Sequence, residues 1–286
     1  MKGSKEPHIW HIKTNKWGFR GGEVSIEKPD NTLRVICLGG STTYDTVTDG
    51  RTWPEKLEAI LQKKHPTKKV QVFNFGMNAA SLPFNIVQFA LLGVHFKPDL
   101  VILYAGHNDL WAGIGLKDFR PDYSHSLRHW DDSRVSAQHY IPRWAMKSAF
   151  VTALVVAFDR KRGIEYDLVR QILRFSRSED PLEGSWAFQN GIITLQGIAE
   201  VHGARLLVIT PHWGFRKNDI QKKFVDQIKE TANNAGIPLL DAYSQFPVGD
   251  SSLQIDDVHF SDKGGTLFAQ MIADAIEIQQ LLVLEE

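Results

Sequence analysis

Val35-Ile36-Cys37-Leu38-Gly39-Gly40-Ser41-Thr42-Thr43 is the stretch of sequence that decides the fold. Its apolar half predicts a strand covered on both faces, as in a parallel sheet, and its two glycines predict a sharp turn at the end of that strand. The turn would lift Ser41 away from the strand. A serine hydroxyl in this position can act as a nucleophile when a neighbouring base takes its proton.

Further apolar runs predict strands of the same kind, and helical patterns separate them. The predicted strands are Leu33–Leu38, Val70–Phe75, Leu100–Ala105, Arg205–Thr210 and Pro238–Asp241. Strands that alternate with helices predict an α/β fold, here a three-layer α/β/α sandwich with a central, mostly parallel five-stranded sheet. The active site of such a fold lies at the carboxyl ends of its strands. Residues that lie within three positions after a predicted strand end are Ser41, Gly76, Asn108 and Trp213.

The predicted helices begin with a capped turn, Thr52-Trp53-Pro54-Glu55, which has a proline near its start. The others are Pro83–His95, Ala187–His202, Asp219–Ala235 and Lys263–Gln280. A chain of 286 residues is long enough for one large α/β domain. We therefore expect a single domain over residues 1–286, with an N-terminal extension over 1–31 and a partly helical insertion at about 111–185, near the mouth of the site.

The composition argues against several classes of partner. The chain has 33 basic and 33 acidic residues, so no global field favours nucleic acid or an anionic membrane surface. The best apolar run, Ala149 to Phe158, is about half the ~20 residues that span a bilayer, so no membrane span is expected. The start of the chain lacks the apolar stretch of a secretory signal. The compartment therefore stays open: cytoplasmic for the chain as given, or extracytoplasmic if an N-terminal signal has been removed.

Asp256-Asp257-Val258-His259 supplies the groups that a serine nucleophile needs. A serine hydroxyl is a poor nucleophile at neutral pH, and the imidazole of His259 can accept its proton. A carboxylate can hold that imidazole in one tautomer and stabilise the imidazolium. We prefer Asp256 to the competing Asp257, because a separation of three residues lets a turn bring the two side chains together. Ser41, Asp256 and His259 are therefore the predicted catalytic residues.

The fragments Asn74-Phe75-Gly76 and Gly106-His107-Asn108-Asp109 can stabilise the alkoxide that forms when a serine attacks an ester. The predicted oxyanion hole consists of the N–H groups of Ser41 and Gly76 and the side-chain amide of Asn108. Loss of one such donor costs on the order of 3–4 kcal/mol. Glycine at position 76 would also let a substrate approach the backbone closely.

Three residues are predicted to contact the substrate: Gly40, His107 and Trp213. Gly40 belongs to the turn beside the serine, and Trp213 follows the fourth predicted strand, where its ring could form a wall. For His107 a purely structural role is the competing interpretation. His125 and His129 have a spacing that can bind zinc on a helix, but no clear third ligand accompanies them. We therefore expect no metal and no other cofactor.

Together the four fragments resemble the sequence blocks of the SGNH hydrolase superfamily, also called GDSL-type esterases and lipases. Gly39–Thr42 is similar to the first block, Asn74–Gly76 to the second, Gly106–Asp109 to the third and Asp256–His259 to the fifth. Gly40 stands where the more familiar form of the first block has an aspartate. The resemblance spans roughly Asn15 to Ala275.

The resemblance implies a flavodoxin-like sandwich and a serine esterase that forms an acyl-enzyme on Ser41. It also implies short acyl esters as substrates, with O-acetyl groups on carbohydrate as a natural target. The expected partner is then a small-molecule or carbohydrate ester, and not a nucleic acid. Two alternatives stay open: an O-acyltransferase that uses the same serine, and a non-catalytic carbohydrate-binding protein. The sequence does not indicate an oligomeric state.

Overall fold

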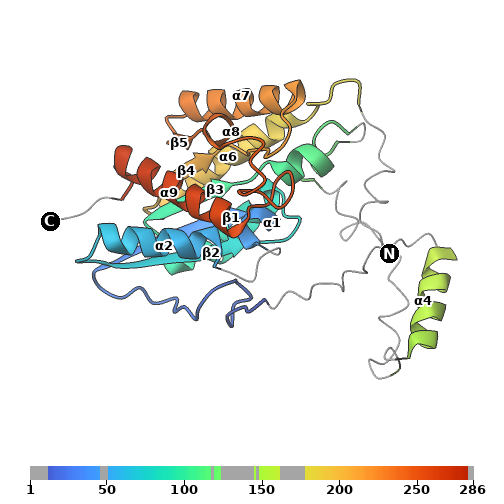
Figure 1. Cartoon of the computed structure of the whole chain (residues 1–286), viewed down its shortest axis with the longest axis horizontal. Helices are drawn as coiled ribbons and strands as arrows, with labels where there is room; N and C mark the ends of the chain where they lie inside the picture. Colours follow the sequence, from blue (N-terminus) through green and yellow to red (C-terminus); the bar gives the residue numbers. More distant parts are fainter. Residues whose placement is uncertain are drawn as a thin grey trace. The chain divides into compact units, whose positions relative to one another are not determined.

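Five parallel strands form the central sheet in the order β2–β1–β3–β4–β5 (Figure 1). Their bounds are β1 Thr32–Gly39, β2 Lys69–Gly76, β3 Leu100–Tyr104, β4 Arg205–Ile209 and β5 Leu239–Leu240. Each strand coincides with a predicted one, and helices lie on both faces of the sheet, so the predicted α/β sandwich is confirmed. The computed structural model describes residues 12–45, 51–116, 119–123, 145, 148–161 and 178–282.

The strand order reverses at β1, which has β2 on one side and β3 on the other. In an open parallel sheet, the carboxyl end of the strand at such a reversal is where ligands bind. Gly39 pairs with Gly76 of β2 and with Tyr104 of β3, so the three strands end at one level. The next element, α1 Ser41–Tyr44, begins at this level. The topology therefore places Ser41 at the usual site of this fold class.

Helices enclose the sheet in two layers (Figure 1). On one face α2 Trp53–Lys64 packs against α9 Asp262–Ile278. On the other face α6 Ser185–Val201 contacts both α3 Leu82–Leu91 and α7 Asp219–Asn234. Shorter elements are the 3-10 helix η1 Gly93–Phe96, the π-helix η2 Asp109–Gly113 and the helix α8 Ala242–Gln245. Alternate residues of β1, Val35 and Cys37, join the core under α2 and α9, as a period of two requires.

The ends of the helices show where local signals hold and where they do not. At the predicted capped start, the Thr52 side chain accepts from the Glu55 N–H, and the Glu55 carboxylate accepts from the Thr52 N–H at 2.8 Å. In contrast, α3 ends at Leu91, earlier than predicted. Leu92 leaves the helical region with φ −131°, and Lys97, the C-cap of η1, has a left-handed conformation with φ 50°. This reversal directs the chain into β3.

Arg34 of β1 anchors the segment that precedes the sheet. Its guanidinium donates to the carbonyls of residues 25–27 at 2.7–3.0 Å, to the carbonyl of Phe96 at 2.7 Å and to the side-chain oxygen of Gln71 at 2.9 Å. The side chain is fully buried, and a charged group in such a place is tolerated when its donors are satisfied. These bonds tie the N-terminal segment to the sheet.

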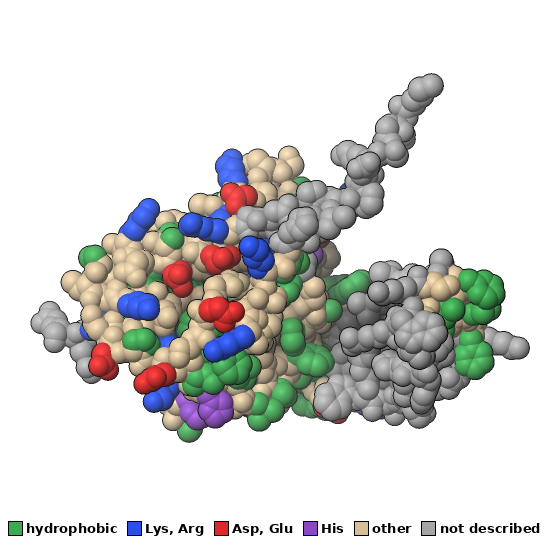
Figure 2. Space-filling view, turned by 90° about the horizontal axis from the view of Figure 1, so that it is seen from below, with side chains coloured by type: hydrophobic (Ala, Val, Ile, Leu, Met, Phe, Trp, Pro, Cys, Tyr) green, Lys and Arg blue, Asp and Glu red, His purple; other side chains and the backbone are tan. Residues whose placement is uncertain are grey.

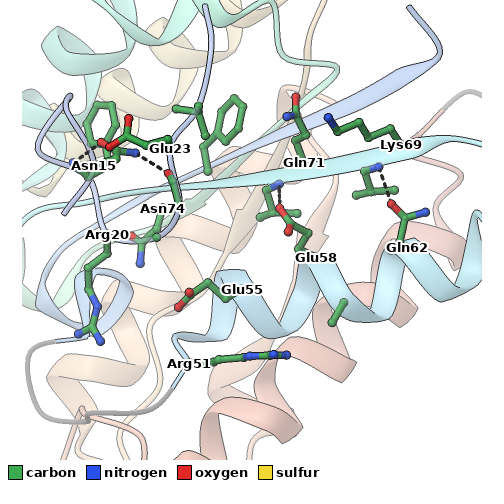
Figure 3. Close-up of a pocket in the computed structure, with 18 residues that line it drawn as sticks. Asn15, Arg20, Glu23, Arg51, Glu55, Glu58, Gln62, Lys69, Gln71 and Asn74 are labelled. Carbon is green, nitrogen blue, oxygen red and sulfur yellow. Dashed lines mark hydrogen bonds between the residues drawn. The ribbon is translucent and has the colours of Figure 1, made fainter. Parts of the chain in front are cut away.

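The outer edge of β2 is covered by side chains (Figure 3). The Val70 N–H donates to Gln62 Oε1 at 2.9 Å, and the Val72 N–H donates to Glu58 Oε2 at 2.8 Å, as the dashed lines in Figure 3 show. Further along, the N-terminal segment bridges the strand at Asn74 in the antiparallel sense. Because an uncovered edge strand is a template for pairing with other chains, these contacts protect the fold from edge-to-edge association.

Acidic and basic side chains are interspersed on the face of the protein seen in Figure 2. This agrees with the balanced charge of the sequence, and the described part of that face shows no large patch of one sign. Among the residues that the structure describes, no helix is both long and apolar enough to cross a membrane.

The chain divides into two compact units. The first consists of Met1–Trp111 with Ser185–Glu286, and the second of Ala112–Gly184. The first holds the whole sheet. In the second, which includes helix α4 Ala149–Lys161, the Gly115 N–H donates to the carbonyl of Glu183 at 2.8 Å. The second unit falls in the range of the predicted insertion; a single domain with an extension over residues 1–31 stays a prediction.

We expect Arg34→Lys to lower the free energy of unfolding by about 3 kcal/mol. A lysine ammonium cannot reach all the acceptors of the guanidinium, and each buried acceptor left unpaired costs about 1–3 kcal/mol. Unfolding in urea, followed by circular dichroism, measures the change. The matched control is Arg205→Lys, at an exposed position of β4, which should change stability by less than about 0.5 kcal/mol. Equal losses in the two variants would contradict the anchoring role.

Candidate active site

Ser41 is positioned by a turn that has no room for side chains. A Cβ atom on Gly39 would lie 2.2 Å from Thr43 Oγ1 and 2.4 Å from the carbonyl oxygen of Tyr104. Gly40, the N-cap of α1, has extended dihedral angles, and Ser41 is the first residue of the helix. The turn predicted from the two glycines therefore brings the hydroxyl to the end of β1.

Ser41, His259 and Asp256 form a continuous chain of hydrogen bonds. His259 Nε2 lies 2.9 Å from Ser41 Oγ, and His259 Nδ1 lies 2.7 Å from Asp256 Oδ2. A carboxylate only accepts hydrogen bonds, so Nδ1 carries the proton and Nε2 is the acceptor for the serine hydroxyl. The structure thus brings the three predicted catalytic side chains together, although 218 positions separate Ser41 from His259.

Asp256 is held as a carboxylate. Partial burial raises its pKa, but hydrogen bonds from the His259 side chain and from the N–H groups of Val258 and His259 outweigh this effect and lower the pKa from 3.8 to about 2. Because the folded value lies below the unfolded one, ionised Asp256 stabilises the fold above about pH 4, and this contribution is lost as the pH falls towards 2. At neutral pH the group is therefore a negative charge beside the imidazole.

Asp257 has a separate task. Its Oδ1 accepts from the N–H groups of Phe215 at 3.0 Å and Arg216 at 3.3 Å, and its carbonyl accepts from the Gly214 N–H at 2.7 Å. The two adjacent carboxylates therefore diverge. Asp256 contacts His259, as preferred from the sequence, and Asp257 fastens the loop after β4 to the loop that carries His259.

Asn108 lies beside the turn that carries Ser41. Its Nδ2 donates to the carbonyl of Ala80 at 2.8 Å, which fixes the amide. A Cβ atom on Gly40 would lie only 2.5 Å from Nδ2, so the amide occupies the space that a side chain at position 40 would take. The remaining N–H of this amide is a candidate donor to an oxyanion at Ser41. Glycine at position 40 therefore leaves room for the Asn108 amide beside Ser41.

Gly76 differs from its prediction. Its N–H already donates to Asn74 Oδ1 at 3.0 Å, and Asn74 Nδ2 donates to the carbonyl of Thr43 at 2.8 Å. A Cβ atom at position 76 would lie 2.2 Å from the backbone nitrogen of Tyr44, so glycine is needed here for the packing of α1 against β2. Because an oxyanion role would require the bond to Asn74 to break, we do not retain Gly76 in the candidate oxyanion hole.

The structure places His107 and Trp213 next to each other, with ring centroids 5.1 Å apart. His107 Nε2 lies 2.7 Å from the carbonyl of His212 and must donate to it. Burial lowers the pKa of His107 to about 4, against the opposing effect of this hydrogen bond, so the ring is neutral at neutral pH. Trp213 is only 6% exposed and therefore offers little surface to a substrate. Its substrate contact stays a prediction, and the structure shows it as a support for His107.

Sequence reasoning missed Tyr104, His212 and Gln254, which form a buried polar cluster with His107. Tyr104 Oη bonds to His212 Nδ1, and the Gln254 amide lies 2.8 Å from His212 Nε2. The one available signal was that His212 comes two residues after a predicted strand end, close to the position, three residues after one, that drew attention to Asn108.

Within the described ranges, no three His, Cys, Asp or Glu side chains group so that they could hold a metal ion. His125 and His129, considered from the sequence for zinc, lie outside the described residues.

Comparison with known proteins gives a family and a shared fold. Residues 37–267 match the GDSL-like Lipase/Acylhydrolase family. Among curated proteins, none matches the chain in sequence. Similar solved structures include the acetylxylan esterase Axe2 from Geobacillus stearothermophilus, at 14% identity and a TM-score of 0.51, with 85% of this chain and 94% of that chain covered.

Two more solved structures resemble the chain to the same degree. The lipase/acylhydrolase from Enterococcus faecalis has 16% identity and a TM-score of 0.51, and the match covers 86% of this chain and 96% of that one. The acetyl xylan esterase AlAXEase has 17% identity and a TM-score of 0.52, with coverages of 85% and 100%. At identities this low, the likeness shows the fold alone.

We expect Asp256→Asn to lower kcat for p-nitrophenyl acetate by about 10²–10⁴. An amide at position 256 can donate to Nδ1, which favours the tautomer whose Nε2 carries the proton and cannot accept from Ser41. The matched control is Asp257→Asn, which keeps one oxygen as an acceptor for the loop and should stay within about tenfold of the unchanged protein. A larger loss in the Asp257 variant than in the Asp256 variant would reverse the assignment.

We expect Gly40→Ala to lower kcat by about 10²-fold, because the new methyl group would displace the Asn108 amide. The Ser41–His259 pair should persist, so a serine-reactive phosphonate should still label the protein. Gly197→Ala is the control, since a Cβ atom there meets nothing within 4 Å. Full activity of the Gly40 variant would show that the amide has no part in the reaction.

Proposed function

Because the chain belongs to the GDSL-like Lipase/Acylhydrolase family, and is therefore a carboxylic ester hydrolase, we propose that it is a serine esterase that removes short acyl groups, with acetyl esters of carbohydrates as its substrates. The observation that supports this proposal most strongly is the hydrogen-bonded chain from Ser41 through His259 to Asp256. A hydroxyl, a bare imidazole nitrogen and an ionised carboxylate in this order are the parts of an activated nucleophile.

In the first half of the proposed reaction, His259 Nε2 takes the hydroxyl proton as Ser41 Oγ attacks the acyl carbon. The imidazolium that forms is stabilised by the carboxylate of Asp256. Negative charge develops on the former carbonyl oxygen, where the Ser41 N–H and the Asn108 amide donate hydrogen bonds. His259 then returns the proton to the departing alcohol, which leaves the acyl group on Ser41.

In the second half, His259 takes a proton from a water molecule that attacks the acyl carbon. Collapse of the second tetrahedral intermediate breaks the bond to Ser41 Oγ, and His259 gives the proton back to the serine. The carboxylic acid leaves, and the site returns to its starting state. One imidazole therefore serves as base and acid in both halves, so its fixed tautomer matters throughout.

Two observations support the proposed substrate class. Two of the solved structures that share the fold are named acetylxylan esterases. The balanced charge of the chain suits a neutral substrate better than a polyanion. Acetylated xylooligosaccharides are therefore the first natural substrates to assay.

We expect Ser41→Ala to lower the turnover of p-nitrophenyl acetate by at least about 10⁴-fold, because the hydroxyl that the reaction acylates is removed. Ser25→Ala, at an exposed position before the sheet, is the matched control and should leave kcat unchanged. Undiminished turnover by the Ser41 variant would remove the proposed nucleophile.

The same assay separates the proposed hydrolase from the alternatives. With acetylated xylooligosaccharide and a polyol present, a hydrolase releases acetate, whereas an acyltransferase makes acylated polyol in excess of free acid. Binding of the oligosaccharide without turnover of any ester in a broad panel would indicate a non-catalytic binding protein.

A further inference from the structure

A chain of buried polar side chains lies behind the candidate active site. Tyr104 of β3, His212 of the loop after β4 and Gln254 are 0%, 1% and 4% exposed. Tyr104 Oη bonds to His212 Nδ1, and the terminal amide of Gln254 lies 2.8 Å from His212 Nε2. Both imidazole nitrogens of His212 therefore have a polar partner away from bulk water. The reaction proposed above uses none of these groups.

The protons of this chain allow one arrangement that satisfies both the phenol and the imidazole. Burial, and next to it the neighbouring His107, lowers the pKa of His212 well below its usual range, so the ring is neutral and carries one N–H. If the Gln254 N–H donated to Nε2, the proton would sit on Nδ1 and the Tyr104 hydroxyl would be left without an acceptor. With the amide oxygen on Nε2 instead, Tyr104 donates to Nδ1 and Nε2–H donates to Gln254.

The orientation of the Gln254 amide distinguishes the two arrangements. With the amide nitrogen on His212, Gln254 Oε1 is buried and has no hydrogen-bond partner among the described residues. A half-turn of the amide brings this oxygen to His212 Nε2 and puts the amide nitrogen in its former place. The half-turn keeps the contact with His212, so the need of the Tyr104 hydroxyl for an acceptor decides in its favour.

His212 is connected to the loop that carries the catalytic pair. Gln254 forms an antiparallel bridge with Phe260, and the Ile255 N–H donates to the carbonyl of His259 at 2.9 Å. The ring of His212 stacks on Phe260, with centroids 4.6 Å apart and planes 8° apart. Asp256 and His259 are thus enclosed by two residues that His212 holds, one by a hydrogen bond and one by stacking.

His212 is also connected to the loop that carries Asn108. Its carbonyl accepts from His107 Nε2 at 2.7 Å, and His107 directly precedes the candidate oxyanion donor. His212 therefore contacts residues that support the proposed base, His259, and also His107, which adjoins the candidate oxyanion donor Asn108.

We propose that His212, as the Nε2–H tautomer between Tyr104 and Gln254, is a positioning residue that holds the Asp256–His259 loop in register with Ser41. This inference rests on the proposed function, since it assigns His212 a part in the same reaction. His212 does not touch the reacting atoms and acts through Gln254 and Phe260. Displacement of a catalytic group by about 1 Å can lower the rate on the order of 100-fold, so the effect of such a residue falls on kcat.

The tautomer is tested first, by NMR of protein with nitrogen-labelled histidine and no substrate present. The signals of His212 are assigned with a His212→Asn variant. We expect a protonated Nε2 and a bare Nδ1 at neutral pH. A protonated Nδ1 would overturn the proposal, and because this measurement needs no turnover, its result is independent of whether the chain is an esterase.

The positioning role is tested by kinetics of two variants at position 254. Gln254→Glu keeps an oxygen that can accept from His212 Nε2–H, whereas Gln254→Met fills a similar volume and offers no such acceptor. We expect the Met variant to lose about 10–100-fold in kcat for p-nitrophenyl acetate with KM within about twofold, and the Glu variant to recover most of that loss. Equal kcat values in the two variants, or a loss confined to KM, would overturn the proposal.

His212→Phe completes the set, with His202→Phe at an exposed position after α6 as the matched control. We expect the former to lose kcat as Gln254→Met does and the latter to keep it. If His212→Phe does not fold, the tautomer and the position-254 pair decide the question. Ser41→Ala tests the proposed function separately from the role of His212. Activity that survives this substitution counts against the proposed function, whereas the tautomer measured by NMR is unaffected by that outcome.

Discussion

The lack of space at Gly39 is the constraint on which the candidate site depends. Any side chain there would collide with Thr43 and with the backbone of Tyr104, so β1 must end in glycine for α1 to fold back against its neighbours. Gly76 meets the same condition against Tyr44 at the end of β2. These contacts, and not the hydroxyl chemistry, fix where Ser41 stands. The imidazole positioned to accept the Ser41 proton belongs to His259, which lies 218 positions further along the chain.

Local patterns in the sequence predicted most of the framework. The continuous apolar runs gave all five strands, and the threonine, proline and glutamate at 52–55 gave the start of α2. The same patterns predicted which residues follow strand ends, and therefore that Ser41 and Asn108 would be neighbours. The end of α3 was missed, because no strong stop signal precedes the 3-10 turn that replaces its last residues.

What sequence reasoning could not supply depends on side-chain contacts between distant elements. The Gly76 N–H looked like a free donor, and only the orientation of the Asn74 amide shows that it is engaged. Likewise, no spacing along the chain relates Tyr104, His212 and Gln254, which come from separate elements. In contrast, the contact of Asp256 is local. Its partner, His259, is three residues away, so the geometry of a single turn was enough to prefer Asp256 to Asp257.

The long separation between nucleophile and base has a consequence for biosynthesis. A ribosome releases Ser41 well before His259, which lies 218 positions later, and α9, which covers one face of the sheet with α2, comes later still. A nascent chain without these parts therefore lacks both the base and a closed core. The loop with the acid and base needs almost the whole polypeptide before it can close on the serine. Because the site is completed last, an unfinished chain would not hydrolyse esters. Ester hydrolysis would then indicate that the chain has finished folding.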